Sequence, residues 1–299
     1  MNAPTGVAAD ARDHYVSLDG RTTIDVRHAS DAAAVHGDDT AALRRRFLVQ
    51  RMFRADAITL TYSHVDRMVI GGAMPVGESL LLQALKPIGS PRFLDRRELG
   101  IINVGGPGTV HADGTAYALA KLDSLYLGMG TADVRFDSAS AAEPARFYLV
   151  SAPAHASHPA RKVGVGDPRS FSTGAAATAN ARTIYQSIHP EVMTSCQLVM
   201  GFTQLEPGSV WNTMPAHRHD RRCEIYFYFD VADDARVFHL MGEPSETRHI
   251  VVANEEAVIS PVWSIHSGVG TRNYAFVWAM GGDNVDYTDM DAVAIEDLR

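Results

Sequence analysis

The strongest signal in the chain is the stretch Met214-Pro215-Ala216-His217-Arg218-His219-Asp220-Arg221-Arg222-Cys223-Glu224. His217 and His219 stand two residues apart, and side chains alternate along a β-strand, so both imidazoles point to the same face. After a turn at residues 220–222, Glu224 shares one face of the next strand with Tyr226 and Tyr228, and its carboxylate can enter the same space. The stretch therefore predicts two neighbouring strands that carry metal ligands.

A fourth ligand is expected much later in the chain, at His266. This side chain can return to the same cavity if the sheet closes into a barrel. Three imidazole nitrogens and one carboxylate oxygen suit zinc, iron, manganese, cobalt or nickel, and composition does not choose among these metals. The alternative is a set of surface or core histidines, but the His-x-His spacing with a following Glu favours a metal site.

The rest of the chain is dominated by short β-branched or aromatic runs separated by Gly, Pro, Asp and Asn. Such runs predict strands at 58–63, 100–104, 145–150, 197–203, 224–229, 236–241, 250–253 and 274–280. A short helix is expected at 38–47, and Asp113-Gly114 is typical of a tight hairpin. The prediction is an all-β fold of barrels or sandwiches with a few short helices.

The two halves of the chain resemble each other locally. Asp95-Arg96-Arg97-Glu98 parallels Asp220-Arg221-Arg222-Cys223-Glu224, with one residue of offset between the glutamates, and this favours duplication of one β unit. Where the second copy has His217 and His219, the first has Arg92 and Leu94, which do not suit a divalent metal. We therefore expect a tail at 1–37, an N-terminal domain without metal at 38–152, a linker at 153–180 and a C-terminal metal-binding domain at 181–299.

Composition narrows the classes of protein. A chain of 299 residues can hold two domains, and its net charge of −8 is spread without a long run of Lys or Arg, so nucleic acid is not an expected partner. No window approaches the roughly 20 apolar residues that cross a bilayer, and the polar N-terminus lacks the pattern of a secretory signal. Cys196 and Cys223 form no metal or redox motif and are expected to be reduced, packed thiols, so the cytoplasm is the expected location.

The metal-ligand pattern resembles the cupin superfamily, whose first motif is His-x-His with a following Glu and whose second motif adds a His. From Arg44 onward the chain is similar to the bacterial 5-keto-4-deoxyuronate isomerases, also called 4-deoxy-L-threo-5-hexosulose-uronate ketol-isomerases, of pectin breakdown. The blocks that carry the resemblance lie at 62–67, 96–100, 211–215, 246–251, 259–261 and 263–270. The N-terminal tail and residues 164–178 differ from the family pattern.

The resemblance implies two tandem cupin-type barrels, a bicupin, in a homo-oligomer that is hexameric. It implies one zinc ion per chain on His217, His219, Glu224 and His266, and conversion of 5-dehydro-4-deoxy-D-glucuronate, a small keto-uronate, to 3-deoxy-D-glycero-2,5-hexodiulosonate. Such an isomerisation moves a proton between adjacent carbons through an enediol-like intermediate, which a Lewis-acidic metal stabilises while a base moves the proton.

The candidate bases are Tyr226, His249 and His64, or a metal-bound hydroxide. For Tyr226 the alternative is an aromatic barrel lining, and for the two histidines it is a structural role. The sequence does not rank these candidates.

The substrate carboxylate calls for a guanidinium, because arginine offers a planar pair of donors. Arg182 and Arg222 are the candidates, with structural ion pairs as the alternative for both. Trp263 is expected to cover the sugar, or else to pack in the core.

Two other functions remain open. One is a different metal-dependent cupin enzyme, a sugar isomerase or a dioxygenase, and oxygen consumption with bound iron would favour the dioxygenase. The other is a non-catalytic sugar-binding cupin, which retained metal without turnover would favour.

Overall fold

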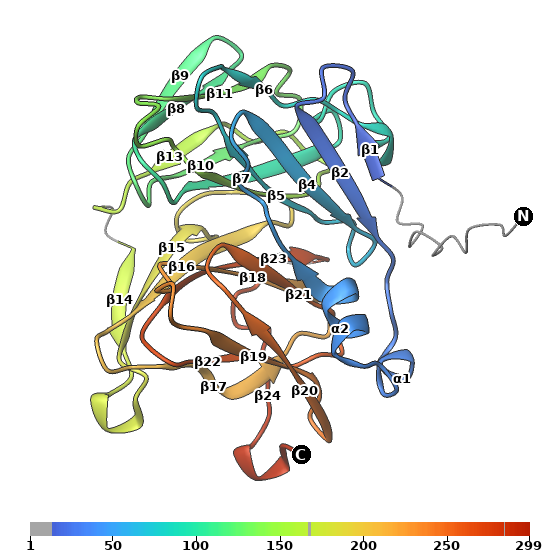
Figure 1. Ribbon diagram of the computed structural model, residues 1–299, viewed down its shortest axis with the longest axis vertical. Coiled ribbons are helices and arrows are strands. Elements are labelled where there is room, and N and C mark those ends of the chain that lie inside the picture. The colour runs from blue at the N-terminus through green and yellow to red at the C-terminus, as the bar shows by residue number, and fades with distance from the viewer. Residues whose placement is uncertain (1–13, 167–168, 284) are drawn as a thin grey trace, which may run out of the picture.

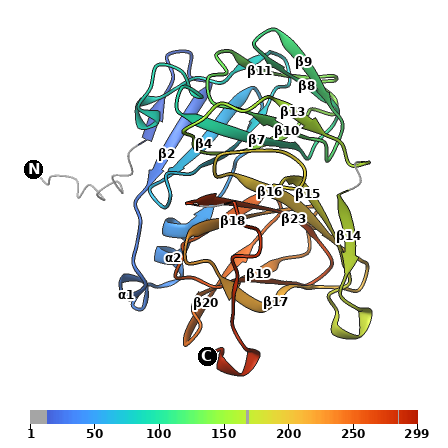
Figure 2. The same cartoon turned by 180° about the vertical axis from the view of Figure 1, so that it is seen from behind.

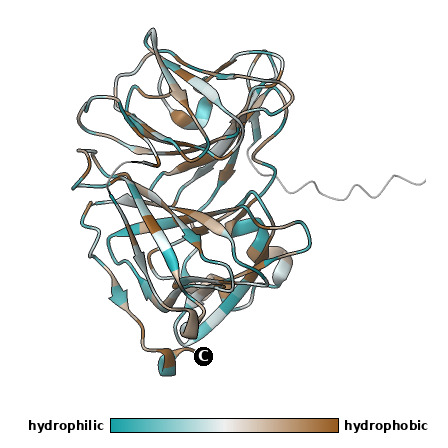
Figure 3. Ribbon diagram, turned by 90° about the vertical axis from the view of Figure 1, so that its left-hand side faces the viewer, coloured by the Kyte–Doolittle hydropathy of each residue, from teal (hydrophilic) through white to brown (hydrophobic). Residues whose placement is uncertain are grey.

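The computed structural model describes residues 14–166, 169–283 and 285–299. It consists of two stacked halves, each built from two facing β-sheets, with the N-terminal half above the C-terminal half in Figure 1. Seen from the side in Figure 3, the halves lie one on top of the other. The prediction of an all-β fold with a few short helices is confirmed.

The N-terminal half contains an eight-stranded and a four-stranded sheet. In spatial order, the larger sheet comprises β1 (His14–Val16), β2 (Thr22–Arg27), β4 (Ala57–Ser63), β5 (Val69–Met74), β12 (Phe147–Pro153), β7 (Arg97–Asn103), β10 (Ser124–Leu127) and β13 (Arg161–Val163). The smaller sheet comprises β6 (Leu80–Leu81), β11 (Val134–Ser138), β8 (Gly108–Ala112) and β9 (Thr115–Leu119). Asp113 and Gly114 join β8 to β9 with positive φ angles of 47° and 81°, so the predicted tight hairpin is present.

The C-terminal half contains a seven-stranded and a five-stranded sheet. The larger sheet comprises β14 (Ser170–Thr173), β15 (Arg182–Ile188), β16 (Val199–Leu205), β23 (Ala275–Gly282), β18 (Arg222–Phe229), β21 (Glu256–Ser260) and β3 (Leu48–Val49). The smaller sheet comprises β20 (Glu246–Val252), β19 (Val237–Glu243), β22 (His266–Gly270), β17 (Trp211–Arg218) and β24 (Asp291–Ala292).

The strand orders of the two halves match. The order β4-β5-β12-β7-β10 in the first half corresponds to β15-β16-β23-β18-β21 in the second, and β6-β11-β8-β9 corresponds to β17-β22-β19-β20. This agreement is what duplication of one β unit predicts. The Asp-Arg-Arg block leads into β7 in the first half and into β18 in the second. These two strands hold equivalent positions in their sheets.

A shared core joins the halves, because the two larger sheets pack face to face. Tyr148 of β12 stacks on Phe227 of β18 with ring centroids 4.3 Å apart, and both side chains are fully buried. Gly100 of β7 allows this close approach, since a Cβ there would lie only 2.9 Å from the Ile188 side chain. The interface is therefore a hydrophobic core that holds the two halves together.

The expected tail is wrong for residues 14–37. Strand β2 runs parallel to β4 and places Ile24 and Val26 in the N-terminal core, so it belongs to the sheet. Helices α1 (Ala32–Val35) and α2 (Thr40–Phe47) then cross to the C-terminal half, where β3 pairs with β21. Figures 1 and 2 show these helices beside the lower half. The domain boundary expected at residue 38 is therefore also wrong. The strand pairings of this region join segments that are far apart in the chain, so no local sequence pattern predicts them.

The predicted helix at 38–47 is present as α2. The Asp39 side chain accepts a hydrogen bond from the Ala42 amide and caps the first turn. The expected linker at 153–180 also contributes strands, because β13 pairs with β10 and β14 pairs with β15. Within the described ranges, no helix is long and apolar enough to cross a membrane.

Candidate metal centre

The four predicted ligand side chains come together between the two sheets of the C-terminal half. His217 lies near the end of β17, and His219 follows that strand directly. His266 opens β22 and pairs in register with His217. Glu224 reaches the same point from β18 in the facing sheet. All four side chains are buried, and one donor atom from each lies within 4.8 Å of the others.

The donor atoms have the spacing of a coordination shell. Nε2 of His219 and Nε2 of His266 each lie 2.8 Å from Oε2 of Glu224. Nε2 of His217 lies 3.0 Å from Nε2 of His266. Four donors placed tetrahedrally at bond lengths of about 2.0–2.1 Å around zinc would be roughly 3.3 Å apart. The cluster therefore needs only small shifts to hold such an ion.

The electrostatics favour the protonation states that bind a metal. Burial, aided by His266, lowers the pKa of His217 to about 3, so this imidazole is neutral at neutral pH. Burial alone would raise the pKa of Glu224. The Coulombic effect of His266 and the close contacts of the carboxylate with the His219 and His266 imidazoles outweigh burial and hold that pKa well below its usual range. A neutral imidazole and an ionised carboxylate are the ligand forms.

The surroundings of His219 orient it for coordination. Its Nδ1–H donates to the backbone carbonyl of Asp289, which leaves the lone pair on Nε2 directed at the cluster. Nδ1 of His266 is buried with no hydrogen-bond partner among the described residues. The residues present thus fit a divalent transition metal with mixed nitrogen and oxygen ligands.

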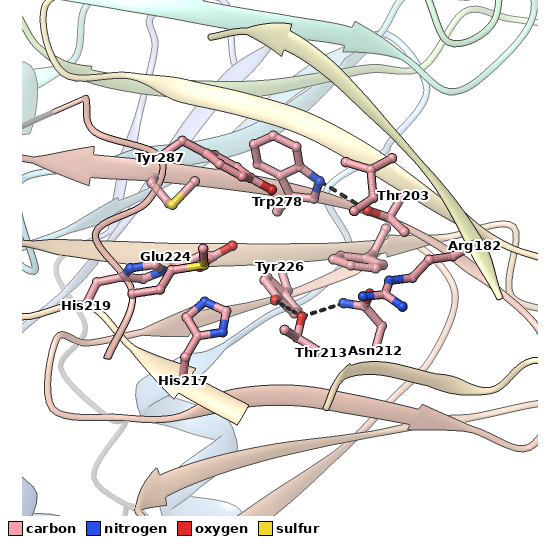
Figure 4. A pocket seen from close by; sticks show the side chains of 14 residues that line it. Arg182, Thr203, Asn212, Thr213, His217, His219, Glu224, Tyr226, Trp278 and Tyr287 are labelled. Atoms are coloured by element: carbon pink, nitrogen blue, oxygen red, sulfur yellow. Dashed lines mark hydrogen bonds and ion pairs between the residues drawn. The ribbon is translucent and has the colours of Figure 1, made fainter. Parts of the chain in front are cut away.

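A cavity of about 250 Å³ leads from the metal ligands across the interior of the C-terminal half. Figure 4 shows His217, His219 and Glu224 at one end and Arg182 at the other. The remaining lining side chains are Ile184, Thr203, Asn212, Thr213, Tyr226, Phe276, Trp278, Met280, Tyr287 and Met290. The cavity is thus mostly apolar, with polar groups concentrated at its ends and along one wall.

One wall carries a short hydrogen-bonded chain (Figure 4). Asn212 Nδ2 donates to Thr213 Oγ1 at 2.6 Å, and that hydroxyl lies 2.9 Å from the Tyr226 phenol oxygen. Burial, together with the charge of Glu224, raises the pKa of Tyr226 well above its usual range. Tyr226 is therefore a neutral phenol whose orientation is set by Thr213.

Arg182 supplies the cation at the far end of the cavity. Its Nη1 donates to the Asn180 carbonyl at 2.8 Å, whereas its buried Nε has no hydrogen-bond partner within the described residues. Burial lowers its pKa, but an arginine stays charged at neutral pH. The cavity thus ends in a cation whose buried Nε is an unused donor among the described residues.

Two of the predicted catalytic residues lie elsewhere. His249 is exposed on the outer face of β20, because alternation turns Ile250 and Val252 inward, and it contacts Phe238. His64 is exposed on the N-terminal half, where it stacks on His28. Neither lines the cavity. The structure thus places His249 and His64 outside the cavity, and Tyr226 is the candidate base that lines it.

Two of the predicted substrate-binding residues also miss the cavity. The indole of Trp263 packs edge-on against Phe47 and donates to the Ser30 carbonyl at 3.0 Å, so it anchors the N-terminal helical segment. Arg222 is fully buried and donates to the backbone carbonyls of residues 287 and 289. The structure thus places both side chains outside the cavity, where they bind the protein's own backbone.

Among the cavity residues to which sequence reasoning assigned no role are Asn212, Thr213, Trp278 and Tyr287. Asn212 and Thr213 precede His217 in the same strand, so polar residues upstream of the motif were the available signal. Trp278 lies on a strand that was predicted, and strand alternation could have placed it inside. Tyr287 comes from a C-terminal segment without periodic pattern, and the sequence holds no signal for it.

Comparison with known proteins gives a consistent result. Residues 49–295 match the model of the KduI/IolB family. The 4-deoxy-L-threo-5-hexosulose-uronate ketol-isomerase 2 of Rhizobium meliloti (strain 1021) is 58% identical over 274 residues, which are 92% of this chain and 97% of that protein. The 4-deoxy-L-threo-5-hexosulose-uronate ketol-isomerase of Dickeya dadantii (strain 3937) is 51% identical over 273 residues, with 89% and 98% covered.

Solved structures share the fold at low sequence identity. An IolB-like protein of Salmonella typhimurium LT2 has a TM-score of 0.62 at 15% identity, covering 76% of this chain and 87% of that one. The Bacillus subtilis oxalate decarboxylase, described with Mn(II) centres, has a TM-score of 0.50 at 10% identity, covering 76% and 71%. These likenesses support the predicted cupin fold, and the family match with its close relatives shows that the chain belongs to the KduI/IolB family.

Proposed function

We propose that this chain is a ketol-isomerase that converts 5-dehydro-4-deoxy-D-glucuronate to 3-deoxy-D-glycero-2,5-hexodiulosonate in pectin and uronate catabolism. Relatives at 51–58% identity over most of the chain are named for this activity. The observation that carries the proposal is a buried three-histidine, one-glutamate cluster at one end of a cavity that has Arg182 at the other.

We assign a zinc ion to His217, His219, Glu224 and His266. When bound, zinc supplies Lewis acidity for the carbonyl and hydroxyl oxygens of the reacting carbons. The protein holds the four donors rigidly, because three lie at the ends of paired strands β17 and β22 and the fourth lies on β18. The apolar side chains Phe276, Trp278 and Met280 line the cavity beside this site and exclude water.

The shape of the cavity suits an open-chain substrate. In a six-carbon keto-uronate, the aldehyde and its neighbouring hydroxyl lie at one end and the carboxylate lies at the other. With the reacting carbons at the metal ligands, the carboxylate points along the cavity to Arg182, whose buried Nε lacks a partner among the described residues. A guanidinium can donate two parallel hydrogen bonds to a carboxylate, and this contact fixes the direction in which the substrate enters.

Tyr226 is the candidate for moving the hydroxyl proton between O2 and O1, because a neutral phenol can donate its own proton to one oxygen as it accepts a proton from the other. The reaction takes a proton from C2 and returns one to C1, while the hydroxyl proton at O2 is exchanged for one at O1. The Tyr226 hydroxyl reaches the cavity within the same strand face as Glu224, two residues earlier, and Thr213 holds it at 2.9 Å. This position beside the reacting carbons is the reason for the assignment.

A coupled assay on 5-dehydro-4-deoxy-D-glucuronate tests the function. The metal-loaded protein should turn over, and both a chelated sample and the double variant His217→Ala, His219→Ala should not. Absence of turnover by the intact, metal-loaded protein would refute the isomerase. Oxygen consumption by the iron-loaded protein would then favour a cupin dioxygenase, and retained metal without any turnover would favour a sugar-binding protein.

We further propose that the N-terminal half has a structural role without metal. Its interior is filled by apolar side chains such as Leu99, Ile101 and Phe136, each fully buried. The expectation is one metal ion per chain. Elemental analysis that found two ions per chain would contradict this assignment.

A homo-oligomer, and specifically a hexamer, is also part of the proposal. Phe238 of β19 and Val251 of β20 pair in register on the outer face of their sheet, and their side chains are 37% and 36% exposed. Association of copies through this apolar strip is one way to cover it. Light scattering after size-exclusion chromatography tests the assembly, and a monomeric mass at micromolar concentration would exclude it. Cys196 and Cys223 are both free thiols, which agrees with a proposed cytoplasmic location.

A further inference from the structure

Residues 285–292, here called the C-terminal strap, form one wall of the cavity. Tyr287 and Met290 from this strap line the cavity beside the metal ligands. At its end the strap becomes β24, where Ala292 pairs with His217 and Asp291 pairs with Arg218. The strap is thus joined to the strand that carries the first metal ligand. In Figure 2 the chain runs from this region down to the C-terminus.

Two buried side chains hold the strap by its backbone. Arg222 Nη2 lies 3.3 Å from the carbonyl oxygen of Tyr287 and 3.4 Å from that of Asp289. The metal ligand His219 donates its Nδ1–H to the same Asp289 carbonyl. Arg222 is 0% exposed and opens β18, three residues after His219, so both anchors lie where the chain passes from β17 to β18.

The anchored strap places the Tyr287 phenol over the substrate space. Its ring lies 5.4 Å from that of Trp278 and 5.1 Å from that of His189, so aromatic contacts limit its rotation. Figure 4 shows the phenol beside Trp278, across the cavity from Tyr226. Burial, with a contribution from Glu224, raises the pKa of Tyr287 to about 12, so the phenol keeps its proton at neutral pH. A side-chain hydrogen bond with Gln186 limits this rise and also holds the phenol, whose O–H can donate to a substrate oxygen.

We propose that Tyr287 is a substrate-positioning residue of the isomerase, and that the strap seats it through the hold of Arg222 and His219 on the Asp289 carbonyl. This inference rests on the proposed function for the identity of the substrate. A metal on Nε2 of His219 withdraws electrons from the ring and makes Nδ1–H a stronger donor, so metal occupancy tightens the strap. Arg222 acts through the strap and does not touch the substrate.

The first arm of the test is kinetic. Tyr287→Phe removes one neutral hydrogen-bond donor and keeps the ring, so KM for the keto-uronate should rise about 3- to 10-fold with kcat changed less than about threefold. Metal content should be unchanged. Arg272→Ala, at an exposed arginine of the same half that pairs with Asp234, is the control and should leave both constants unchanged. An unchanged KM in Tyr287→Phe would overturn the positioning role.

The second arm measures the strap itself by hydrogen–deuterium exchange. Amides of residues 285–292 should exchange at least about 10-fold faster in Arg222→Met and in chelated wild-type protein, while amides of β4 and β5 serve as the internal reference. Equal strap exchange with and without metal would overturn the coupling. The chelated wild type keeps the test decisive if Arg222→Met does not fold. Absence of turnover by metal-loaded wild type would refute the proposed function alone, since the exchange arm needs no substrate.

Discussion

Replacing Glu98 tests how the two halves are held together. This carboxylate on β7 is 0% exposed and accepts four hydrogen bonds. One comes from the Tyr126 phenol at 2.7 Å. The others come from three consecutive backbone amides just before β16, those of Cys196 at 2.8 Å and of Gln197 and Leu198 at 2.7 Å each. A side chain of the N-terminal half thus binds the backbone of the C-terminal half.

The expected loss follows from these contacts. A hydrogen bond to a charged acceptor contributes about 1.5–3 kcal/mol, and a buried donor left without an acceptor costs about 1–3 kcal/mol. The free-energy contributions of the four bonds do not add fully, because after the substitution the chain segment at 195–198 relaxes and water enters the site. Glu98→Ala should therefore lower the free energy of unfolding by about 4 kcal/mol or more, a large part of the roughly 5–15 kcal/mol that a domain has. Tyr126→Phe removes one donor and should cost only about 1–2 kcal/mol.

Urea unfolding at pH 7, followed by tryptophan fluorescence and far-UV circular dichroism, measures both values. The loss in Glu98→Gln should fall between those of Glu98→Ala and Tyr126→Phe. The glutamine amide keeps the shape of the side chain but turns an N–H group toward the neighbouring donors. Glu78→Ala, at an exposed carboxylate paired with Arg21, is the matched control and should leave the unfolding midpoint nearly unchanged. A loss below about 1 kcal/mol in Glu98→Ala would refute the reasoning, because it would mean that the halves do not depend on this contact.

Three further predictions concern the site and its surroundings. Tyr226→Phe should lower kcat by about 100- to 1000-fold if the phenol transfers the proton, with metal content unchanged; a drop below about threefold would remove it from the mechanism. Arg182→Ala should raise KM about 10- to 100-fold for the keto-uronate through loss of a charge-assisted contact, and equal KM values would contradict the carboxylate assignment. His239 is fully buried beside Tyr228, and burial, with His266, lowers its pKa to about 3, against about 6.5 when unfolded. Between these values only the unfolded state binds the proton, so stability falls as the pH falls, by about 1.4 kcal/mol per pH unit from His239 and in the same sense from His217, whose pKa is also about 3. His239→Gln should reduce the slope by the share of His239 in urea titrations at pH 7, 6 and 5, and an unchanged slope would exclude His239 as a source.

The sequence by itself determined the all-β class and the candidate ligand set. Strand alternation is local, so the spacing of His217 and His219 on one strand and the place of Glu224 on the next could be read directly. His266 needed the further assumption that the sheets close around a cavity. The general resemblance to one family of keto-uronate isomerases was likewise present in short blocks of residues.

Only the tertiary structure decided which other polar residues reach the cavity. His249 faces outward because the hydrophobic residues beside it on β20 must face inward, and Trp263 is taken by the N-terminal helical segment. Tyr287 enters through a strap that has no repeating pattern. Each of these outcomes depends on contacts between segments far apart in the chain, which local spacing does not encode.

Glu98 and Glu224 show most clearly what the sequence predicts and what only tertiary packing decides. Glu98 shares a strand face with Gly100 and Ile102, which pack against the other half, whereas Glu224 shares its face with Tyr226 inside the cavity. A shift of one residue moves a side chain to the opposite face of a strand. The offset was visible in the sequence, but only the packing of the two large sheets decided that one glutamate joins the halves while the other faces the candidate metal centre.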